Sequence, residues 1–570
     1  MVGTAFSPRT WGIVAGIACL TTLQVCLAIW THCCFEGRYD GPFLISSHFG
    51  VPSALADAGI RPTITDQYPQ VGWDGQFYFF MANDPLGLAD TAEHLDTITY
   101  RYQRIGIPAL AWGISRITGH SVTSAFWYLT VQNILVAAGF GVLVGYLSAC
   151  GISAGWAMTW LGAGGTWYTL AYGLPDAAAD GVFIIAFWAV ITGRLWGYLL
   201  ASTLLVLIRE GYVLFPFAVF LATVWGKLDW SRSWWTRSLL TTIPGIAVIA
   251  WAVYLSVHFG IAVTSPERNP SITTGLPGVE FWKSLRHAWE ICDRQGVVYR
   301  LISMASLITI LVIAARHCRR HLAFAVVLPY LLLMLCLGPV VWQHHQGYFK
   351  AMGTVLIVGI LLLTITPNRI LKGILVLNLL IGIDWNLIQA IIPAPFFSPN
   401  SVILTDMPPS EHPFGSSLND IRGKFTPFPD VPNQSPLRSM TDEIEWMDAR
   451  ETVATEYQGI WRYWHRELVP FPIRIHNRGT EAWSANPRLG TGAVHLVAEL
   501  LPADRSRTLM QQRVPLPRSI EPGESLDLLV WIRLGNRQIA HLHLAMEQVG
   551  VHPFNPHTST RGLHRVIRIR

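Results

Sequence analysis

Apolar segments about as long as a lipid bilayer is thick recur through the first 394 residues of the chain. A helix needs roughly 20 apolar residues to cross the hydrocarbon core of a bilayer. Only 14% of the residues are charged, whereas a soluble domain carries about a quarter. The sequence therefore predicts a polytopic α-helical membrane protein with about eleven spans. The segments run at about 11–30, 122–147, 154–172, 181–193, 196–208, 211–226, 238–257, 300–315, 321–341, 349–366 and 374–394.

The lysines and arginines of the short loops predict how these segments are oriented. The first segment lacks the small-residue cleavage pattern of a secretory signal, so we interpret it as a retained signal anchor. Placing the start of the chain inside puts the basic loops on one side, as the positive-inside rule predicts. These basic residues are Arg194, Lys227, Arg232, Arg237, Arg316, Arg319, Arg320, Arg369 and Lys372. The net charge of +5 is spread over these loops and does not favour nucleic acid as a partner.

The same topology requires residues 105–119 to form a short helix at the outer interface, because an extra span would invert every later loop. Pro108 and the shortness of the segment favour an interfacial position. Three regions then lie outside: a large first loop at 31–121, a second at 258–299, and everything after about 395. We therefore expect residues 1–394 to form the membrane domain.

The chain changes character after the last apolar segment. Residues 395–454 are rich in Pro, Ser, Asn and Asp, which is typical of an extended linker. Residues 455–570 show short alternating runs separated by turns, which indicate an antiparallel β-sandwich. The tail is therefore expected to be a separate unit on the outer side.

The first outer loop contains the segment GWDGQFYFF at residues 72–80. Asp74 on a loop tied to the membrane at both ends can be held against a substrate at the bilayer surface, as a general base requires. The alternative is that Asp74 and Gly75 form an ordinary turn among interfacial aromatic residues. Residue types alone favour the turn slightly.

Two arginines follow in the same loop, in the segment YRYQRIGIP. The guanidinium groups of Arg101 and Arg104 have the planar geometry that suits a phosphate. They can equally be interfacial anchors that pair with lipid headgroups. Both interpretations stay open on the sequence alone.

The remaining polar residues of the apolar core lie at outer ends of the expected helices. Their convergence on one membrane face indicates a site for an amphiphilic ligand with an anionic head. Each of these residues also has a structural explanation, as a helix cap, as part of an ion pair or as part of a solvent-exposed loop. Adjacent histidines lack the spacing of a metal site, so metal binding is weakly supported. These residues are Asp176, Asp180, Arg209, Glu210, His344, His345 and Lys350.

With these residues in place, the chain resembles the glycosyltransferase C superfamily, whose members take a sugar from a polyprenyl-phosphate carrier at the outer face of the membrane. WDGQFYFFMANDPL and YRYQRIGIPALAW resemble a group of bacterial membrane proteins with Asp-Gly-Gln-Phe-Tyr and Arg-Tyr-x-Arg-Ile motifs. The specific part of the resemblance covers residues 72–112. The tail resembles immunoglobulin-like domains appended to bacterial sugar-processing proteins.

The resemblance implies roles for several residues. Asp74 would be the base that activates the acceptor, with Asp40 as the alternative, and Gln76 and Tyr78 of the motif would be further site candidates. Arg101, Arg104, Arg209 and Lys350 would bind the lipid phosphate, and Glu210 and the two histidines would lie near the donor. The resemblance specifies no cofactor with certainty, and a divalent cation stays open. The implied enzyme inverts the sugar in one displacement.

The implied location is the bacterial cytoplasmic membrane, with the N-terminus inside and the tail in the periplasm. The partners would be membrane lipid, a polyprenyl-phosphate sugar and a glycan or glycolipid acceptor. Two alternatives come from other classes of protein. Intramembrane charges and broken helices also mark transporters or flippases for anionic substrates. A membrane anchor that displays a glycan-binding sandwich would explain the tail alone.

Overall fold

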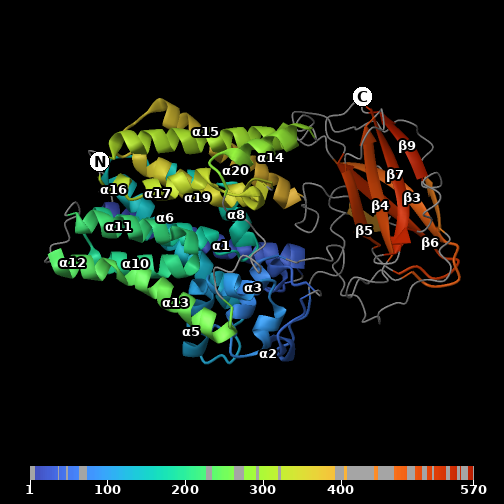
Figure 1. Ribbon diagram of the computed structural model, residues 1–570, viewed down its shortest axis with the longest axis horizontal. Coiled ribbons are helices and arrows are strands. Elements are labelled where there is room, and N and C mark those ends of the chain that lie inside the picture. The colour runs from blue at the N-terminus through green and yellow to red at the C-terminus, as the bar shows by residue number, and fades with distance from the viewer. Residues whose placement is uncertain are drawn as a thin grey trace, which may run out of the picture.

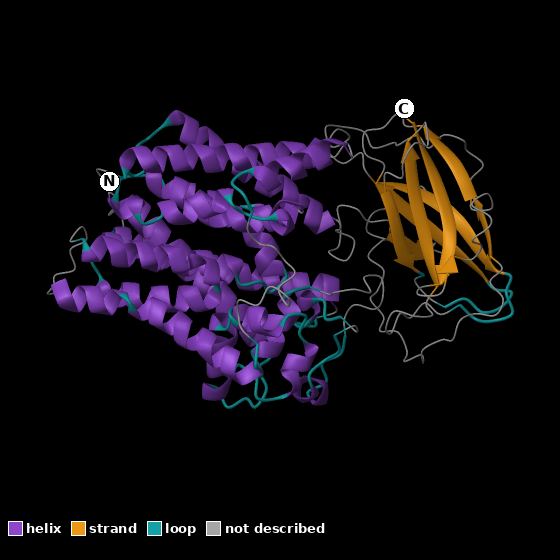
Figure 2. Ribbon diagram, in the orientation of Figure 1, coloured by secondary structure: helices purple, strands orange, loops and turns teal. Residues whose placement is uncertain are grey.

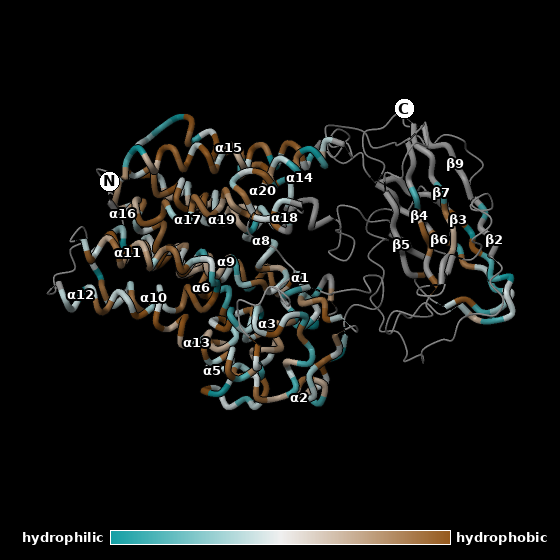
Figure 3. The backbone as a smooth tube through the Cα atoms, in the orientation of Figure 1, coloured by the Kyte–Doolittle hydropathy of each residue, from teal (hydrophilic) through white to brown (hydrophobic). Residues whose placement is uncertain are grey.

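The computed structural model is mostly helical, with strands confined to the C-terminal part of the chain (Figures 1 and 2). Hydrophobic residues dominate the long helices, whereas the first loop, around α2 and α3, mixes hydrophobic and hydrophilic residues (Figure 3). The structure describes residues 7–35, 37–46, 49–62, 73–225, 234–261, 275–290, 294–318, 322–343, 345–391, 403–406, 442–446, 468–483, 494–502, 510–516, 519–533, 539–548, 552–553 and 563–568.

The helices of ten or more residues are α1 (Pro8–Phe35), α5 (Gly106–Ile117), α6 (Ala125–Ala149), α9 (Asp176–Ile191), α10 (Leu195–Ile208), α11 (Leu214–Val224), α13 (Ile243–Phe259), α14 (Val279–Glu290), α15 (Arg294–His317), α19 (His345–Leu362) and α20 (Arg369–Ile391). The shorter ones are η1 (Gly41–Phe43), α2 (Ser53–Asp57), α3 (Gly75–Met81), η2 (Asp90–His94), α4 (Ile98–Tyr102), η3 (Ala154–Ala157), α7 (Met158–Leu161), α8 (Gly164–Ala171), η4 (Glu210–Val213), α12 (Trp234–Thr241), α16 (Leu322–Ala325), α17 (Leu328–Leu335) and α18 (Pro339–Gln343).

Several helices meet the requirements of a membrane span. Among the described residues, four are long and apolar enough to cross a bilayer by length and composition: 8–32, 125–149, 235–259 and 295–317. Counting the bent pair α8 and α9 as one broken span raises this number to five. The expected count of about eleven stays a prediction, because α10, α11 and α19 are apolar but shorter.

Glycines allow the first helices to pack closely. Gly12 and Gly16 of α1 face Gly141 and Gly145 of α6, and a Cβ on Gly12 would lie 2.7 Å from the Gly141 carbonyl oxygen. Small residues spaced four apart are a common way for membrane helices to approach each other. The pair α1 and α6 therefore packs backbone to backbone.

Two expected breaks in the helical pattern are present. Residues 106–117 form the short helix α5, as expected for that segment. The chain between α10 and α11 breaks at Arg209, which has an extended backbone, before η4 begins. Charged residues at such a break leave the apolar helices on either side uninterrupted.

The expectation of a single segment at 154–172 was wrong. The chain there forms η3, α7 and α8 in succession, and α8 meets α9 at an angle of 120°. Gly173, in the left-handed region at φ 65°, and Pro175 separate the two helices. Glycine permits the positive φ and proline favours the first turn of a new helix, which together explain the sharp bend.

Helix α13 holds the first loop through a column of aromatic side chains. Trp251 stacks on Tyr254 and Tyr254 on His258, with ring centroids 5.1 and 5.4 Å apart. These side chains hydrogen-bond the backbone carbonyls of Tyr102, Leu86 and Gly87, respectively, at 2.7–2.8 Å. The short helices of the loop accordingly lie beside α13 (Figure 1).

The strands form two antiparallel sheets, in the orders β1-β6-β3-β2 and β5-β4-β7-β8, with β9 also paired to β7. Facing pairs such as Ile473 and Leu528 are buried, and the neighbouring facing pair Arg474 and Asp527 forms an ion pair at 2.6 Å. The strands are β1 (Ile403–Asp406), β2 (Asp442–Trp446), β3 (Leu468–Asn477), β4 (Val494–Pro502), β5 (Met510–Pro515), β6 (Ser525–Arg533), β7 (Ile539–Gln548), β8 (His552–Pro553) and β9 (Leu563–Arg568).

The expected linker at 395–454 contributes two of these strands, so its description as a linker throughout was wrong. Strand β1 pairs with β6 and β2 pairs with β3, both antiparallel. Each is only four or five residues long and adds an edge to the first sheet. Short edge strands carry little alternation of their own, because the sheet partner supplies their hydrogen bonds.

Candidate active site

Asp74 lies directly before α3, and its position is fixed by close packing against the bend between α8 and α9. A Cβ on Gly75 would lie 1.8 Å from the Tyr172 carbonyl oxygen, so only glycine fits there. The Trp73 ring stacks on Tyr172 with centroids 5.0 Å apart and meets Tyr168 edge-on at 5.5 Å. The Asp-Gly pair is therefore the docked start of a helix and not a free surface turn.

Arg101 holds the Asp74 carboxylate in place. Its Nη2 donates to Asp74 Oδ1 at 2.8 Å, and its Nη2 and Nε donate to Asp96 at 2.6 and 2.8 Å. The Arg101 side chain is 6% exposed, and its guanidinium lies 4.7 Å from the centroid of the Phe77 ring. One buried cation is thus shared between two carboxylates.

This arrangement keeps Asp74 ionised. Burial alone raises the pKa of the Asp74 carboxyl, but the Arg101 guanidinium outweighs burial and, with Lys350 and Arg104, lowers that pKa to about 2. The Asp74 side chain is nevertheless 45% exposed. No described residue donates a hydrogen bond to its Oδ2, so the contact with Arg101 engages only one of the two carboxylate oxygens.

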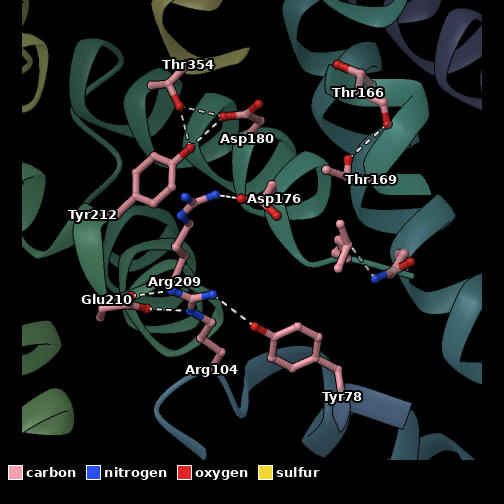
Figure 4. Close-up of polar contacts among 12 residues, drawn as sticks. Tyr78, Arg104, Thr166, Thr169, Asp176, Asp180, Arg209, Glu210, Tyr212 and Thr354 are labelled. Carbon is pink, nitrogen blue, oxygen red and sulfur yellow. Dashed lines mark hydrogen bonds and ion pairs between the residues drawn. The ribbon is translucent and has the colours of Figure 1, made fainter. Parts of the chain in front are cut away.

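Arg104 forms the second ion pair, across 106 residues of sequence. Its Nε and Nη2 donate to the Glu210 carboxylate at 2.8 and 2.6 Å. Nη1 donates to the Tyr78 hydroxyl at 2.9 Å (Figure 4). Nη2 also donates to the Tyr100 hydroxyl at 2.7 Å. The Tyr78 hydroxyl also lies 3.5 Å from Arg101 Nη1, so this tyrosine joins the two arginines.

A third ion pair joins Arg209 to Asp176 at the start of α9 (Figure 4). One turn along α9, Asp180 accepts hydrogen bonds from the Tyr212 hydroxyl at 2.5 Å, the Thr354 hydroxyl at 2.6 Å and the Trp160 indole at 3.4 Å. These partners come from η4, α19 and α7. Asp180 therefore ties the helices together, and its neutral partners make it a structural hydrogen-bond acceptor.

The Lys350 side chain, on α19, forms no ion pair or hydrogen bond with a described residue. Its Nζ lies 5.9 Å from the centroid of the Tyr168 ring. It is close enough to interact electrostatically with Asp74, Arg209, Arg104 and Arg101. Lys350 thus belongs to the Asp74 cluster and is its one cation without a direct carboxylate partner among the described residues.

Close backbone packing places Lys350 there. A Cβ on Gly165 of α8 would lie 2.1 Å from the Phe349 carbonyl oxygen. This contact brings α8 against α19 next to Lys350, and Tyr168 lies on the following turn of α8. Two glycines, Gly75 and Gly165, therefore bring the first loop and α19 to the same helix.

The other predicted site residues lie apart from this cluster or outside the described part of the chain. Asp40 is buried and pairs with Arg38 at 2.5 Å. Gln76 is fully buried and accepts a hydrogen bond from the Ser46 backbone N–H at 2.9 Å, so it supports the loop fold. His344 is outside the described residues, and the backbone of His345 begins α19, but its side chain is outside them.

Sequence reasoning missed several members of the cluster. Asp96 is the second carboxylate on Arg101, and its only signal is its place five residues ahead of that arginine. Tyr100 is one of the tyrosines that flank Arg101 in YRYQRIGIP, and Tyr212 and Thr354 carry no local signal. No group of three or more metal-ligating side chains occurs among the residues that the structure describes.

The cluster can hold an anion at Lys350 and an acceptor hydroxyl at Asp74. Its arginines already pair with carboxylates, so a bound phosphate would share each arginine with the carboxylate that it pairs with.

Comparison with known proteins found no relative: no family model, curated protein or solved structure matches this chain.

Proposed function

We propose that this protein is a membrane glycosyltransferase of the glycosyltransferase C type, which moves a sugar from a polyprenyl-phosphate donor to a cell-envelope acceptor. The observation that carries the proposal is that an ionised, half-exposed Asp74 lies within electrostatic range of Lys350, the cation that has no direct carboxylate partner among the described residues. An anionic base beside a cation is what an acceptor hydroxyl and a departing phosphate need.

Asp74 acts as the base in a single displacement. The acceptor oxygen forms a bond to the anomeric carbon as the bond from that carbon to the phosphate oxygen breaks, and the hydroxyl proton passes to Asp74 Oδ2. The low pKa of Asp74, caused by Arg101, makes it a weak base in the ground state. Proton transfer is therefore expected late, when the sugar is already largely bonded and the hydroxyl has become acidic.

Lys350 balances the charge that develops on the leaving phosphate. A cation pre-positioned where negative charge appears stabilises the transition state more than the ground state. Tyr168 contacts both Lys350 and Trp73 and is itself buried, so it fixes the position of Lys350 relative to the loop that carries Asp74. Arg209 lies within electrostatic range of Lys350 and adds positive potential.

Exposed tryptophans support the membrane orientation that the basic loops predict. Aromatic side chains collect at the two bilayer interfaces. One set lies at helix ends on the side of the basic loops: Trp11, Trp196, Trp225 and Trp235, with exposed fractions of 47–78%. The other set belongs to α5 and α14, on the opposite side in this topology: Trp112, Trp282 and Trp289, with exposed fractions of 37–74%.

In the proposed layout, the protein crosses the bacterial cytoplasmic membrane about eleven times, with its N-terminus inside. The Asp74 cluster and the immunoglobulin-like tail then lie on the outer side, where lipid-linked sugars are used. The tail would bind or position the glycan acceptor. The transporter and display alternatives predict no covalent product.

The experiment is transfer by purified full-length protein in proteoliposomes. Donors are sugars linked to polyprenyl monophosphate, with the matching nucleotide sugars and polyprenyl diphosphate sugars as controls. Product from the monophosphate donors, lost in Lys350→Met and partly kept in Lys350→Arg, supports the proposal. Product from nucleotide sugars alone refutes the lipid donor, and donor movement across the bilayer without product supports the transporter instead.

A further inference from the structure

A groove of about 910 Å³ runs along the outside of the helical body, between α1, α6 and α9. It lies apart from the Asp74 cluster, since none of its lining residues belongs to that site. Most of its wall is apolar or small, including Gly16, Ile17, Ala138, Gly145 and Trp188. Its surface therefore suits a hydrocarbon chain.

Close packing of α1 on α6 creates this groove. Glycines of the two helices meet backbone to backbone, which leaves no large side chain to fill the space beside the contact. Ile13 and Ile17 of α1 and Ile134 of α6 stay 41–64% exposed along its rim. In a bilayer, such exposed apolar residues face lipid.

One end of the groove is cationic. Arg9, at the start of α1, and Arg194, just after α9, both line it. The Arg194 guanidinium lies 4.6 Å from the centroid of the Trp188 ring, which holds it over the groove. Neither arginine side chain forms an ion pair or hydrogen bond with a described residue. Two positive charges therefore lie at the mouth of the groove, and no carboxylate among the described residues pairs with them.

The length of the groove matches one leaflet. Its lining extends along α1 from Pro8 to Leu20. At a helical rise of about 1.5 Å per residue this distance is about 18 Å. Half of the hydrocarbon core measures about 15 Å, so an acyl chain whose headgroup lies at the arginines would fill the groove.

We propose that this groove is a binding site for an anionic phospholipid, with the phosphate between Arg9 and Arg194 and one acyl chain along α1 and α6. The charge of the mouth selects the headgroup, since a zwitterionic lipid brings no net negative charge. A second copy of the chain is a poor occupant, because a two-fold contact through this face would bring the arginine pairs of both copies together. The site lies in the membrane leaflet on the side where the N-terminal end of α1 is located.

The test measures lipid retention by native mass spectrometry of the full-length protein after exchange into detergent with phosphatidylglycerol or phosphatidylcholine of matched chains. A basic residue near an anionic headgroup contributes about fivefold to binding, so Arg9→Gln with Arg194→Gln should weaken phosphatidylglycerol binding by about thirtyfold. The matched control is Arg369→Gln with Lys372→Gln, two basic residues at the start of α20. Ala138→Phe fills the groove with the arginines intact.

Preferential phosphatidylglycerol binding that falls in the arginine pair variant and in Ala138→Phe, but not in the control, supports the site. Equal retention of both lipids overturns the headgroup selection, and equal loss in the control shows that general surface charge is responsible. If lipid-free protein forms a dimer that Ala138→Phe disrupts, a second copy fills the groove and the proposal fails.

Discussion

Replacing Asp74 with Asn removes the negative charge of the proposed base while keeping the size of the side chain. Loss of a general base typically costs about 100-fold to 10,000-fold in rate, which corresponds to about 3–5 kcal/mol in the barrier. We therefore expect kcat/KM of Asp74→Asn to fall by at least about 100-fold. A structural ion pair at this position would leave the rate far less affected.

The fold should tolerate this change. Asp74 is 45% exposed, so its ion pair contributes at most about 1 kcal/mol to stability. Arg101 keeps both of its hydrogen bonds to Asp96 and is not left as an unpaired buried charge. The melting temperature of the purified protein should therefore change by no more than about 3 °C.

The assay compares initial rates of product formation in proteoliposomes that contain equal amounts of folded protein. Asp40→Asn is the matched control, because Asp40 lies in the same loop and pairs with Arg38 instead. We expect this control to retain its activity. A rate for Asp74→Asn within threefold of the native protein would refute the role of Asp74, and loss in Asp40→Asn alone would move the base there.

Three further outcomes follow from the same contacts. Arg101 keeps the pKa of Asp74 at about 2, so the ion pair stabilises the protein above about pH 4 and is lost as the pH falls toward 2. Asp74 therefore stays ionised between about pH 5 and 8, and the pH–rate profile should show no acid limb from Asp74 in that range. Arg101→Gln leaves the Asp74 and Asp96 carboxylates close together without their shared cation. We expect the free energy of unfolding, measured by thermal unfolding, to fall by about 2–4 kcal/mol, and the acid limb of the pH–rate profile to move to higher pH than in the native protein. Gly75→Ala places a Cβ 1.8 Å from the Tyr172 carbonyl oxygen, and the shift it forces on Asp74 should lower kcat by tenfold or more, as measured by the transfer assay, with a KM close to native.

Local chemistry in the sequence was enough to predict several elements. Hydropathy alone predicts α6 and α13 as helices, because apolar length is a property of consecutive residues. The short helix at 106–117 and the break at Arg209 could also be predicted, since proline, charge and segment length act locally. The same local signals missed β1 and β2, whose hydrogen bonds come from partners more than 20 residues away.

The candidate site was only half visible in the sequence. The motifs singled out Asp74, Arg101, Arg104 and Lys350 as chemically suited residues, but not which of them meet. Asp74 and Arg101, which form a hydrogen bond, are 27 residues apart in the sequence, and Arg104 and Glu210 are 106 residues apart. Such pairings depend on which helices pack together, so Tyr212 could not be found beforehand.

What the sequence alone indicated is a helical chain with several apolar helices long enough to cross a membrane, an expected orientation and the residue types available for chemistry. What only the tertiary structure decided is that Arg101 is shared by two carboxylates, that Arg104 and Arg209 are already paired, and that Lys350 is the cation of the cluster without a carboxylate partner among the described residues. The physical reason is the close contact of glycine backbones. Gly75 and Gly165 bring the first loop, α8 and α19 within reach of one another, and no local pattern encodes which carbonyl a glycine will meet.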